Sequence, residues 1–155
     1  MESRFAATLA AGAVVWSVTL LVAPLALHSG GAAAAAATMV YGASSRICHQ
    51  RPERSFHLAG VALPVCARCT GLYLSAAASS LVACAAGLPR RIRSPRVTRS
   101  VLLVSAVPTA LTVAIELAGL AHTTNIVRTI SALPLGATAG WIFVQRLRAE
   151  AFLAG

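Results

Sequence analysis

The sequence contains no lysine, and only four of its 155 residues are acidic. Charged residues of all kinds make up 11% of the chain, whereas a soluble globular domain carries about 25%. So few charges cannot cover the surface of a water-soluble fold. Intrinsic disorder is excluded as well, because it requires low hydrophobicity and here 57% of the residues are apolar. The remaining class is an integral membrane protein.

All thirteen basic residues are arginine, and the formal net charge is +9. In a soluble protein this charge would indicate nucleic-acid binding. Here the arginines fall mostly between apolar stretches, where such residues act as membrane topology signals and contact lipid headgroups. We therefore expect membrane lipids as partners and no nucleic acid.

Four apolar stretches are long enough to cross a bilayer, which takes about 20 residues. They predict an all-α, polytopic membrane protein in which four transmembrane helices form one bundle and a single domain, residues 1–155. The first stretch could also be a cleaved signal peptide, but its apolar run is longer than the usual length of about 7–15 residues. The predicted spans cover residues 5–27, 67–88, 100–121 and 126–144, and a polar loop with cysteine and histidine covers residues 42–66.

The distribution of arginine predicts the orientation. Five arginines lie between residues 90 and 99, and Arg146 and Arg148 follow the last predicted span. The positive-inside rule assigns both places to the cytoplasm. In a multi-pass protein of the cell membrane with four spans, the N- and C-termini are then both cytoplasmic, and the polar loop faces outward.

Reactive side chains concentrate in the polar loop and at the start of the second span. The sequence CHQRPERSFH at residues 48–57 is followed by CARCTG at residues 66–71. Thiolate and imidazole suit Zn²⁺, which takes four tetrahedral ligands. Two of the cysteines are three residues apart, which places both on one face of a helix. We predict a metal site, with zinc as the expected ion, at Cys48, His49, Cys66 and Cys69, with His57 as the alternative fourth ligand.

Two other interpretations of these cysteines stay open. A helix N-terminus and a nearby arginine both stabilise a thiolate, and Arg68 lies between Cys66 and Cys69. The pair could therefore act as a membrane thiol–disulfide oxidoreductase that passes electrons to a quinone, with Cys48 as the resolving thiol. Alternatively, Cys48 forms a plain structural disulfide with Cys66 or Cys69. The sequence leaves open whether the protein is an enzyme.

Two ionisable residues lie inside predicted spans. Glu116 is near the end of the third span and Arg128 is in the first turn of the fourth, and the short loop between them makes these ends neighbours. A charge inside the membrane is costly unless it is paired, so we predict a Glu116–Arg128 ion pair. Asn125 is expected to cap the fourth span, because Asn is a favoured N-cap residue.

The arginines near the outer end suggest a third interpretation, in which the protein binds an anionic lipid headgroup or another anion. Guanidinium groups bind phosphate and carboxylate in bidentate geometry. Small residues along the fourth span allow close helix approach, within the chain or in a homo-oligomer; they are Gly136, Ala139 and Gly140. The residues expected at an anion site, or in support of the cysteines, are Arg54, Arg68, Glu116, Asn125 and Arg128.

The double cysteine motif resembles the family catalogued as domain of unknown function 2085, small membrane proteins of bacteria and archaea. That family pairs C-H-Q-x-P-x-R-S-F with C-x-R-C-x-G, and the chain matches both patterns, at residues 48–56 and 66–71. Asn125 and Arg128 look similar to a later Asn and Arg of the family, whereas Ser75 stands where members often carry Gly. The resemblance implies a multi-span membrane protein with a Cys/His site, and it implies no particular activity.

Overall fold

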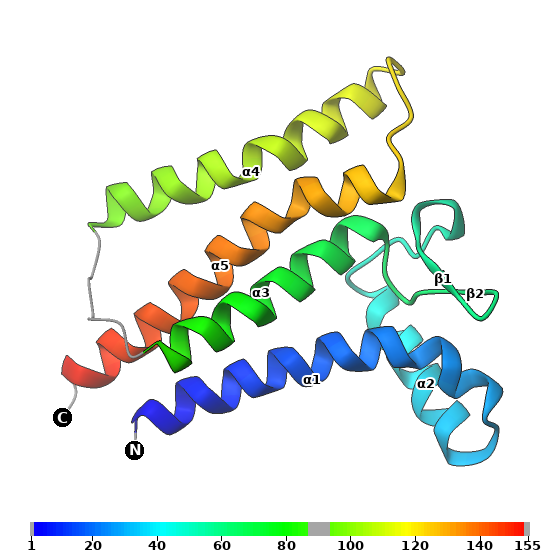
Figure 1. Ribbon diagram of the computed structural model, residues 1–155, viewed down its shortest axis with the longest axis horizontal. Coiled ribbons are helices and arrows are strands. Elements are labelled where there is room, and N and C mark those ends of the chain that lie inside the picture. Colours follow the sequence, from blue (N-terminus) through cyan, green and yellow to red (C-terminus); the bar gives the residue numbers. More distant parts are fainter. Residues whose placement is uncertain (1, 87–93, 154–155) are drawn as a thin grey trace.

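Five α-helices and one short hairpin form the described part of the chain. The computed structural model describes residues 2–86 and 94–153. Figure 1 shows the long helices running side by side, with the shortest helix and the hairpin at one end of the molecule and both ends of the described chain at the other. This helical architecture agrees with the predicted class. The helices are α1 (Glu2–His28), α2 (Gly31–Ser45), α3 (Ala67–Ala85), α4 (Pro95–Leu117) and α5 (Asn125–Leu153).

Among the residues that the structure describes, three helices are long and apolar enough to cross a membrane: α1 over Phe5–His28, α4 over its whole length, and α5 over Asn125–Ala149. The remaining long helix, α3, has 19 residues, carries Arg68 in its first turn and contains three serines. The prediction of four spans in one bundle is therefore not confirmed. In Figure 1, α3 lies between α1 and α5, so its polar residues are covered by neighbouring helices.

The helix bounds differ from the predicted spans at both ends of α4 and α5. Helix α4 begins five residues earlier than predicted, because Ser94 caps it by accepting a hydrogen bond from Val97 N at 3.4 Å. Helix α5 continues nine residues beyond position 144, so Arg146 and Arg148 lie on the helix itself. There Arg148 Nη1 donates to Ala83 O at 2.8 Å, near the C-terminus of α3.

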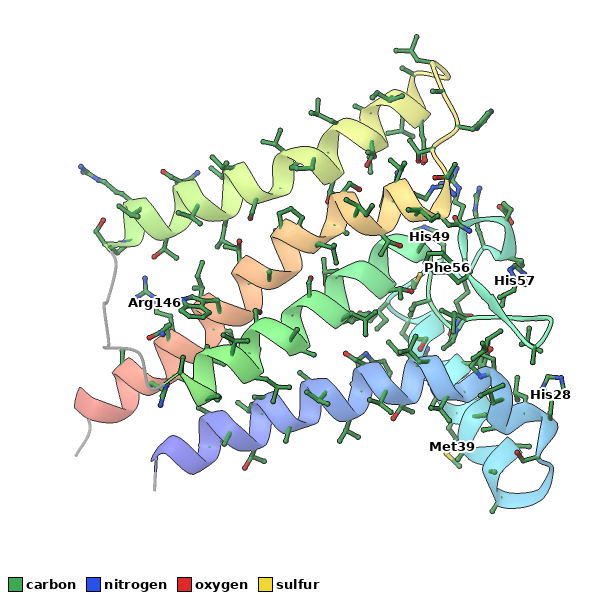
Figure 2. All side chains as sticks on the ribbon, in the orientation of Figure 1. His28, Met39, His49, Phe56, His57 and Arg146 are labelled. Atoms are coloured by element: carbon green, nitrogen blue, oxygen red, sulfur yellow. The ribbon has the colours of Figure 1, made fainter. Side chains whose placement is uncertain are left out.

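The arginine cluster that predicted the orientation is only partly described. Arg90, Arg91 and Arg93 lie outside the described residues, whereas Arg96 and Arg99 belong to the first turns of α4. Figure 2 labels Arg146 at the end of the molecule where both termini lie. The side of the membrane that this end faces stays a prediction.

The predicted polar loop contains short regular elements that an all-α description omits. A 3₁₀ turn, η1 (Pro52–Arg54), is followed by two antiparallel strands, β1 (His57–Leu58) and β2 (Val61–Ala62). Ala59 and Gly60 form the turn between them, both with positive φ, as a type I′ hairpin turn requires. Strands of two residues are too short to produce an alternating pattern that a sequence can reveal.

Helices α3 and α5 approach so closely that their backbones almost touch. A Cβ atom added to Gly71 would lie 2.5 Å from Thr129 O, and one added to Gly140 would lie 2.3 Å from Ala76 O. Gly136 is equally tight against Leu72 O. The predicted role of these small residues in close helix approach is therefore fulfilled within the chain. This contact fixes the position of α3, which carries two of the cysteines at its start.

Candidate metal centre

Three cysteines from two separate segments meet at the end of the bundle that carries α2 and the hairpin. Cys48 follows α2 and is held by a hydrogen bond from its backbone N to Ser44 O at 2.9 Å. Cys66 is the N-cap residue of α3, and Cys69 lies in the first turn of that helix. The three sulfur atoms all lie within 4.8 Å of one another. All four cysteines of the chain are free, so the disulfide considered above is not formed.

The two histidines predicted as the fourth ligand lie outside this cluster. His49 and His57 are both exposed, and neither belongs to the group of close ligand atoms found among the described residues. Because Cys48 turns into the interior, its neighbour in the chain faces solvent. His57 lies on β1, and Figure 2 shows it on the hairpin side of the molecule. The structure thus brings together three of the four predicted ligands.

Gln50 joins the two segments that carry the sulfurs. Its side-chain Nε2 donates to Tyr41 O at 2.8 Å and to Pro64 O at 2.9 Å. The first acceptor lies on α2 and the second lies two residues before Cys66. Gln50 itself has a φ of +48°, which turns the chain sharply after Cys48. A single amide group therefore holds the segment before Cys48 against the segment before Cys66.

The surroundings of the sulfurs are apolar on the side that faces α1. Cys48 is buried in one cluster with Leu20 and Val65, and Trp16 and Tyr73 pack against it. The two aromatic rings meet edge to face, with centroids 6.5 Å apart. The Cys66 backbone N–H donates a hydrogen bond to the Cys48 sulfur at 3.1 Å. The cluster is therefore shielded from water on this side.

Cys66 has the character of a thiolate. The pKa of Cys66 is lowered from about 9 to about 5, chiefly by a hydrogen bond from the Cys69 thiol, although burial acts in the opposite direction. Hydrogen bonds from Cys48 and from neighbouring backbone groups contribute to this lowering. A thiolate is the form of cysteine that binds metals and attacks disulfides.

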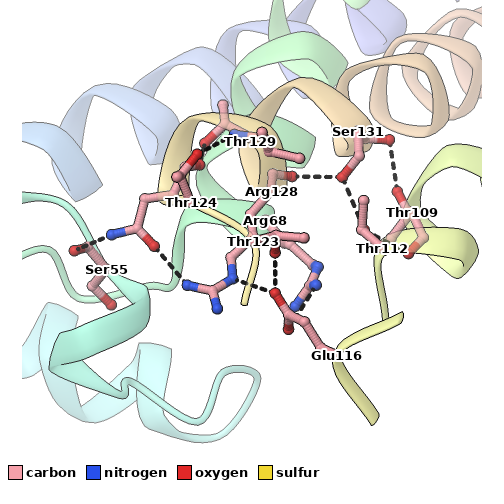
Figure 3. A network of polar contacts seen from close by, with 12 residues as sticks. Ser55, Arg68, Thr109, Thr112, Glu116, Thr123, Thr124, Arg128, Thr129 and Ser131 are labelled. Atoms are coloured by element: carbon pink, nitrogen blue, oxygen red, sulfur yellow. Dashed lines mark hydrogen bonds and ion pairs between the residues drawn. The ribbon is translucent and has the colours of Figure 1, made fainter. Parts of the chain in front are cut away.

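A network of charges supports the start of α3 from the other side. Glu116 accepts from Arg128 Nε at 2.9 Å and pairs with Arg68 Nη2 at 3.0 Å, and all three side chains are largely buried. The predicted Glu116–Arg128 ion pair is thus confirmed, and Arg68 joins it. Figure 3 shows both guanidinium groups converging on the Glu116 carboxylate, with Thr123 as an additional donor. One carboxylate therefore serves two arginines on two different helices.

Asn125 does not cap α5, contrary to the prediction from the sequence. Thr124 is the residue that caps α5, because its Oγ1 accepts from Val127 N at 3.3 Å. Asn125 instead accepts from Arg128 Nη1 at 2.9 Å and donates to Ser55 O at 3.0 Å. It thereby links the polar loop to the charge network. Asparagine is preferred over threonine at the N-cap position of helices, so the sequence favoured Asn125 over its neighbour Thr124.

Several residues that hold the site together were not singled out by sequence reasoning. Ser55 is fully buried, and its Oγ donates to Arg51 O at 3.0 Å. Thr129 Oγ1 donates to Ala67 O at 3.0 Å, directly beside Cys66. Arg54, which was expected at an anion site, donates a hydrogen bond from its backbone N to Arg51 O at 3.0 Å. The family motif contains Gln50 and Ser55, so membership of the motif was the sequence feature that could have indicated their importance.

Comparison with known proteins places the chain in a family. The family model described as "Predicted membrane protein (DUF2085)" matches residues 48–142, which include all three clustered cysteines and the charge network. The chain belongs to the DUF2085 family. An uncharacterized protein of Methanothermobacter thermautotrophicus is 38% identical to this DUF2085 protein over 90 residues, which cover 58% of this chain and 78% of the relative.

A second relative shares a shorter segment with this DUF2085 member. The uncharacterized protein MJ1492 of Methanocaldococcus jannaschii is 53% identical over 34 residues, which is 22% of each chain. No solved structure matches the chain. The family assignment thus supports a membrane protein, and the chemistry of the site has to be argued from its residues.

Proposed function

We propose that this DUF2085 protein binds a thiophilic metal ion, Zn²⁺ in the first place, through Cys48, Cys66 and Cys69. The observation that carries the proposal is the convergence of three free sulfurs within 4.8 Å. Sulfur ligands of a tetrahedral zinc ion lie about 3.8 Å apart, given Zn–S bonds of about 2.3 Å. The thiols therefore need to draw together by no more than about 1 Å to bind the ion.

The fourth coordination position is open to a ligand from outside the cluster. Structural zinc sites are closed by four protein ligands, whereas sites with three protein ligands leave a position for water or a substrate. His49 adjoins Cys48 in the chain and is exposed, so it is the protein group that we propose for this position if the loop rearranges. Three thiolate ligands also suit the charge of the surroundings. A zinc ion with three thiolates carries −1, and the nearby Arg68–Arg128–Glu116 network carries +1, so the two charges cancel.

Metal analysis of the purified protein tests this proposal. The detergent-solubilised protein is expected to contain about one equivalent of zinc after purification with zinc present, and Cys66→Ser is expected to lose it. The matched control is Cys84→Ser, since this fourth cysteine lies on the same helix and outside the cluster. Retention of zinc by the Cys66→Ser protein, or equal loss in both variants, would contradict the proposal.

A second function is favoured by the position of Cys66 at the start of α3. The low pKa of this thiol and its contact with Cys69 suit a thiol–disulfide oxidoreductase. In that reaction Cys66 and Cys69 form a disulfide and release two electrons and two protons, which reduce a membrane quinone to the hydroquinone. Stoichiometric quinone reduction by the metal-free protein, with loss of exactly those two thiols in mass spectrometry, would support this function. Failure of both thiols to oxidise would exclude it.

An anionic ligand at the arginines stays a third proposal. Arg68 and Arg128 both pair with Glu116, so an anion would compete with a carboxylate that is already in place. Binding of an anionic lipid that persists when all clustered cysteines are replaced by serine would favour it over the two functions above.

A further inference from the structure

The depth of the sulfur cluster in the membrane follows from the length of α4. This helix has 23 residues and is about 34 Å long, close to the hydrocarbon thickness of about 30 Å. Its two ends therefore lie near the two boundaries of the hydrocarbon layer. Glu116 is the penultimate residue of α4, so its carboxylate lies at the boundary on the side of the cysteines.

The ion pair between Arg68 and Glu116 places the start of α3 at the same depth as the end of α4. Arg68 Nη2 lies 3.0 Å from Glu116 Oε2, and Arg68 stands between the two cysteines of the second motif. The hydrogen bond from Thr129 Oγ1 to Ala67 O sets the same level independently, because Thr129 is in the second turn of α5. The sulfurs of Cys66 and Cys69 thus lie at the level of the hydrocarbon boundary and not above the membrane.

The connecting segments around the cluster expose large apolar side chains where a water-facing end would carry polar ones. Leu120, between α4 and α5, is 78% exposed, and Met39 on α2 is 72% exposed. Ile47, directly before Cys48, and Leu58, on β1, are also exposed. Figure 1 places the α4–α5 connection, the hairpin and α2 at the same end of the molecule, and Figure 2 labels Met39 there. In water, such a set of apolar groups would be unfavourable.

We infer that this end of the protein, defined by Met39, Ile47, Leu58 and Leu120, is an interaction surface immersed in the bilayer at the boundary between acyl chains and headgroups. The occupant is lipid, because the surface continues the apolar face of α4, in which Ser105 is the one buried residue and whose last residue, Leu117, is 85% exposed. Exposed arginines at the same end, Arg46 and Arg51, suit the lipid phosphates. Helix α2, with 15 residues, is too short to cross the membrane and lies in this boundary.

The surface gives the cysteine cluster an approach from the interface. A ligand that reaches the sulfurs passes through the headgroup layer, which favours lipophilic or lipid-bound species over freely dissolved ones. The inference stands on exposure and depth alone, so it holds whether or not the cluster binds a metal.

Tryptophan fluorescence in brominated lipid vesicles tests the surface. Single-tryptophan variants are made in a Trp16→Phe, Trp141→Phe background, with Leu58→Trp or Leu120→Trp as probes and Glu53→Trp as the matched control. Glu53 is exposed in η1, between the same two cysteine motifs. Phosphatidylcholine brominated near the carbonyl end of its acyl chains is expected to quench both probes several-fold more than the control. The two probes should also emit at shorter wavelength than the control.

Two results would overturn the inference. One is quenching of Leu58→Trp and Leu120→Trp no greater than that of Glu53→Trp. The other is red-shifted emission from both probes, as for a side chain in water. Met39→Trp provides a third probe, on α2. Because Met39 is exposed, this substitution does not disturb the packing, and misfolding does not explain a negative result. Because no variant replaces a cysteine and quenching does not depend on bound metal, failure here is distinguishable from failure of the metal proposal.

Discussion

Arg68 and Glu116 form an ion pair of 3.0 Å that joins the first turn of α3 to the last turn of α4. The two helices make few other contacts, since α4 packs mainly against α5. The pair therefore connects the helix that carries Cys66 and Cys69 to a helix that carries no cysteine. Because Arg128 shares the same carboxylate, removal of Glu116 affects two buried guanidinium groups at once.

Replacement of Glu116 by glutamine is expected to destabilise the protein strongly. The substitution leaves Arg68 and Arg128 buried without a countercharge, and breaking a buried pair in this way costs about 3–5 kcal/mol. Unfolding by SDS in mixed micelles measures the change in the free energy of unfolding. Glu53→Gln is the control, because Glu53 is exposed. Equal unfolding midpoints for the two variants would show that the network does not stabilise the fold.

The glycines between α3 and α5 give a second prediction. Gly140→Ala places a Cβ 2.3 Å from Ala76 O, so the helices must separate, at a cost of about 1–3 kcal/mol. Gly42→Ala is the matched control, since Gly42 is also helical and has no atom near its Cβ position. Thermal unfolding should show a lower transition for Gly140→Ala, and an unchanged or higher one for Gly42→Ala. The reverse order would contradict the close approach.

The side chain of Gln50 is predicted to govern metal affinity without contacting the metal. Gln50→Gly keeps the positive φ of this position and removes the amide that joins Tyr41 O to Pro64 O. Supporting groups of this kind typically contribute about 10–100-fold to metal affinity. Competition with a zinc chelator measures the loss. Gln145→Gly is the control, because Gln145 lies on α5 at the end of the molecule away from the cysteines. An equal loss of zinc affinity in this variant would indicate a general effect on folding.

The thiol of Cys66 is predicted to react at low pH. Since its pKa is lowered to about 5, the thiolate predominates above that value and is lost as the pH falls below it. Alkylation of metal-free protein by iodoacetamide, followed residue by residue in mass spectrometry, should show a half-maximal rate for Cys66 near pH 5. Cys69→Ala removes the hydrogen-bond donor and should move this midpoint upward. An unchanged midpoint in that variant would assign the low value to another cause.

Sequence reasoning identified the cysteines and the Glu116–Arg128 pair because both depend on general rules. Thiols in a polar loop between apolar stretches, and opposite charges at neighbouring helix ends, are visible in one dimension. The role of Arg68 was less visible, because its side chain points away from the sulfurs that flank it in sequence and toward α4. The direction of a side chain at a helix start depends on helix packing, which no spacing reveals.

The position of the histidines and the number of spans could not be predicted from such rules. His49 matches a metal-ligand pattern, but its neighbour Cys48 faces the interior and the alternation of the chain turns His49 outward. Helix α3 resembles a span in its length, yet it is the most enclosed of the long helices and tolerates arginine, threonine and serines. In both cases the outcome was decided by tertiary contacts between residues far apart in sequence.

The contacts of Asn125, Arg128 and Thr129 have a consequence for biosynthesis. All three clustered cysteines precede α5 in the chain and leave the ribosome before it, but the start of α3 is fastened by side chains of α5. The thiols therefore reach their final arrangement only when α5 has entered the membrane. A nascent chain that stalls before α5 would expose unpaired thiols, and loading of the site would mark a chain in which α5 is in place.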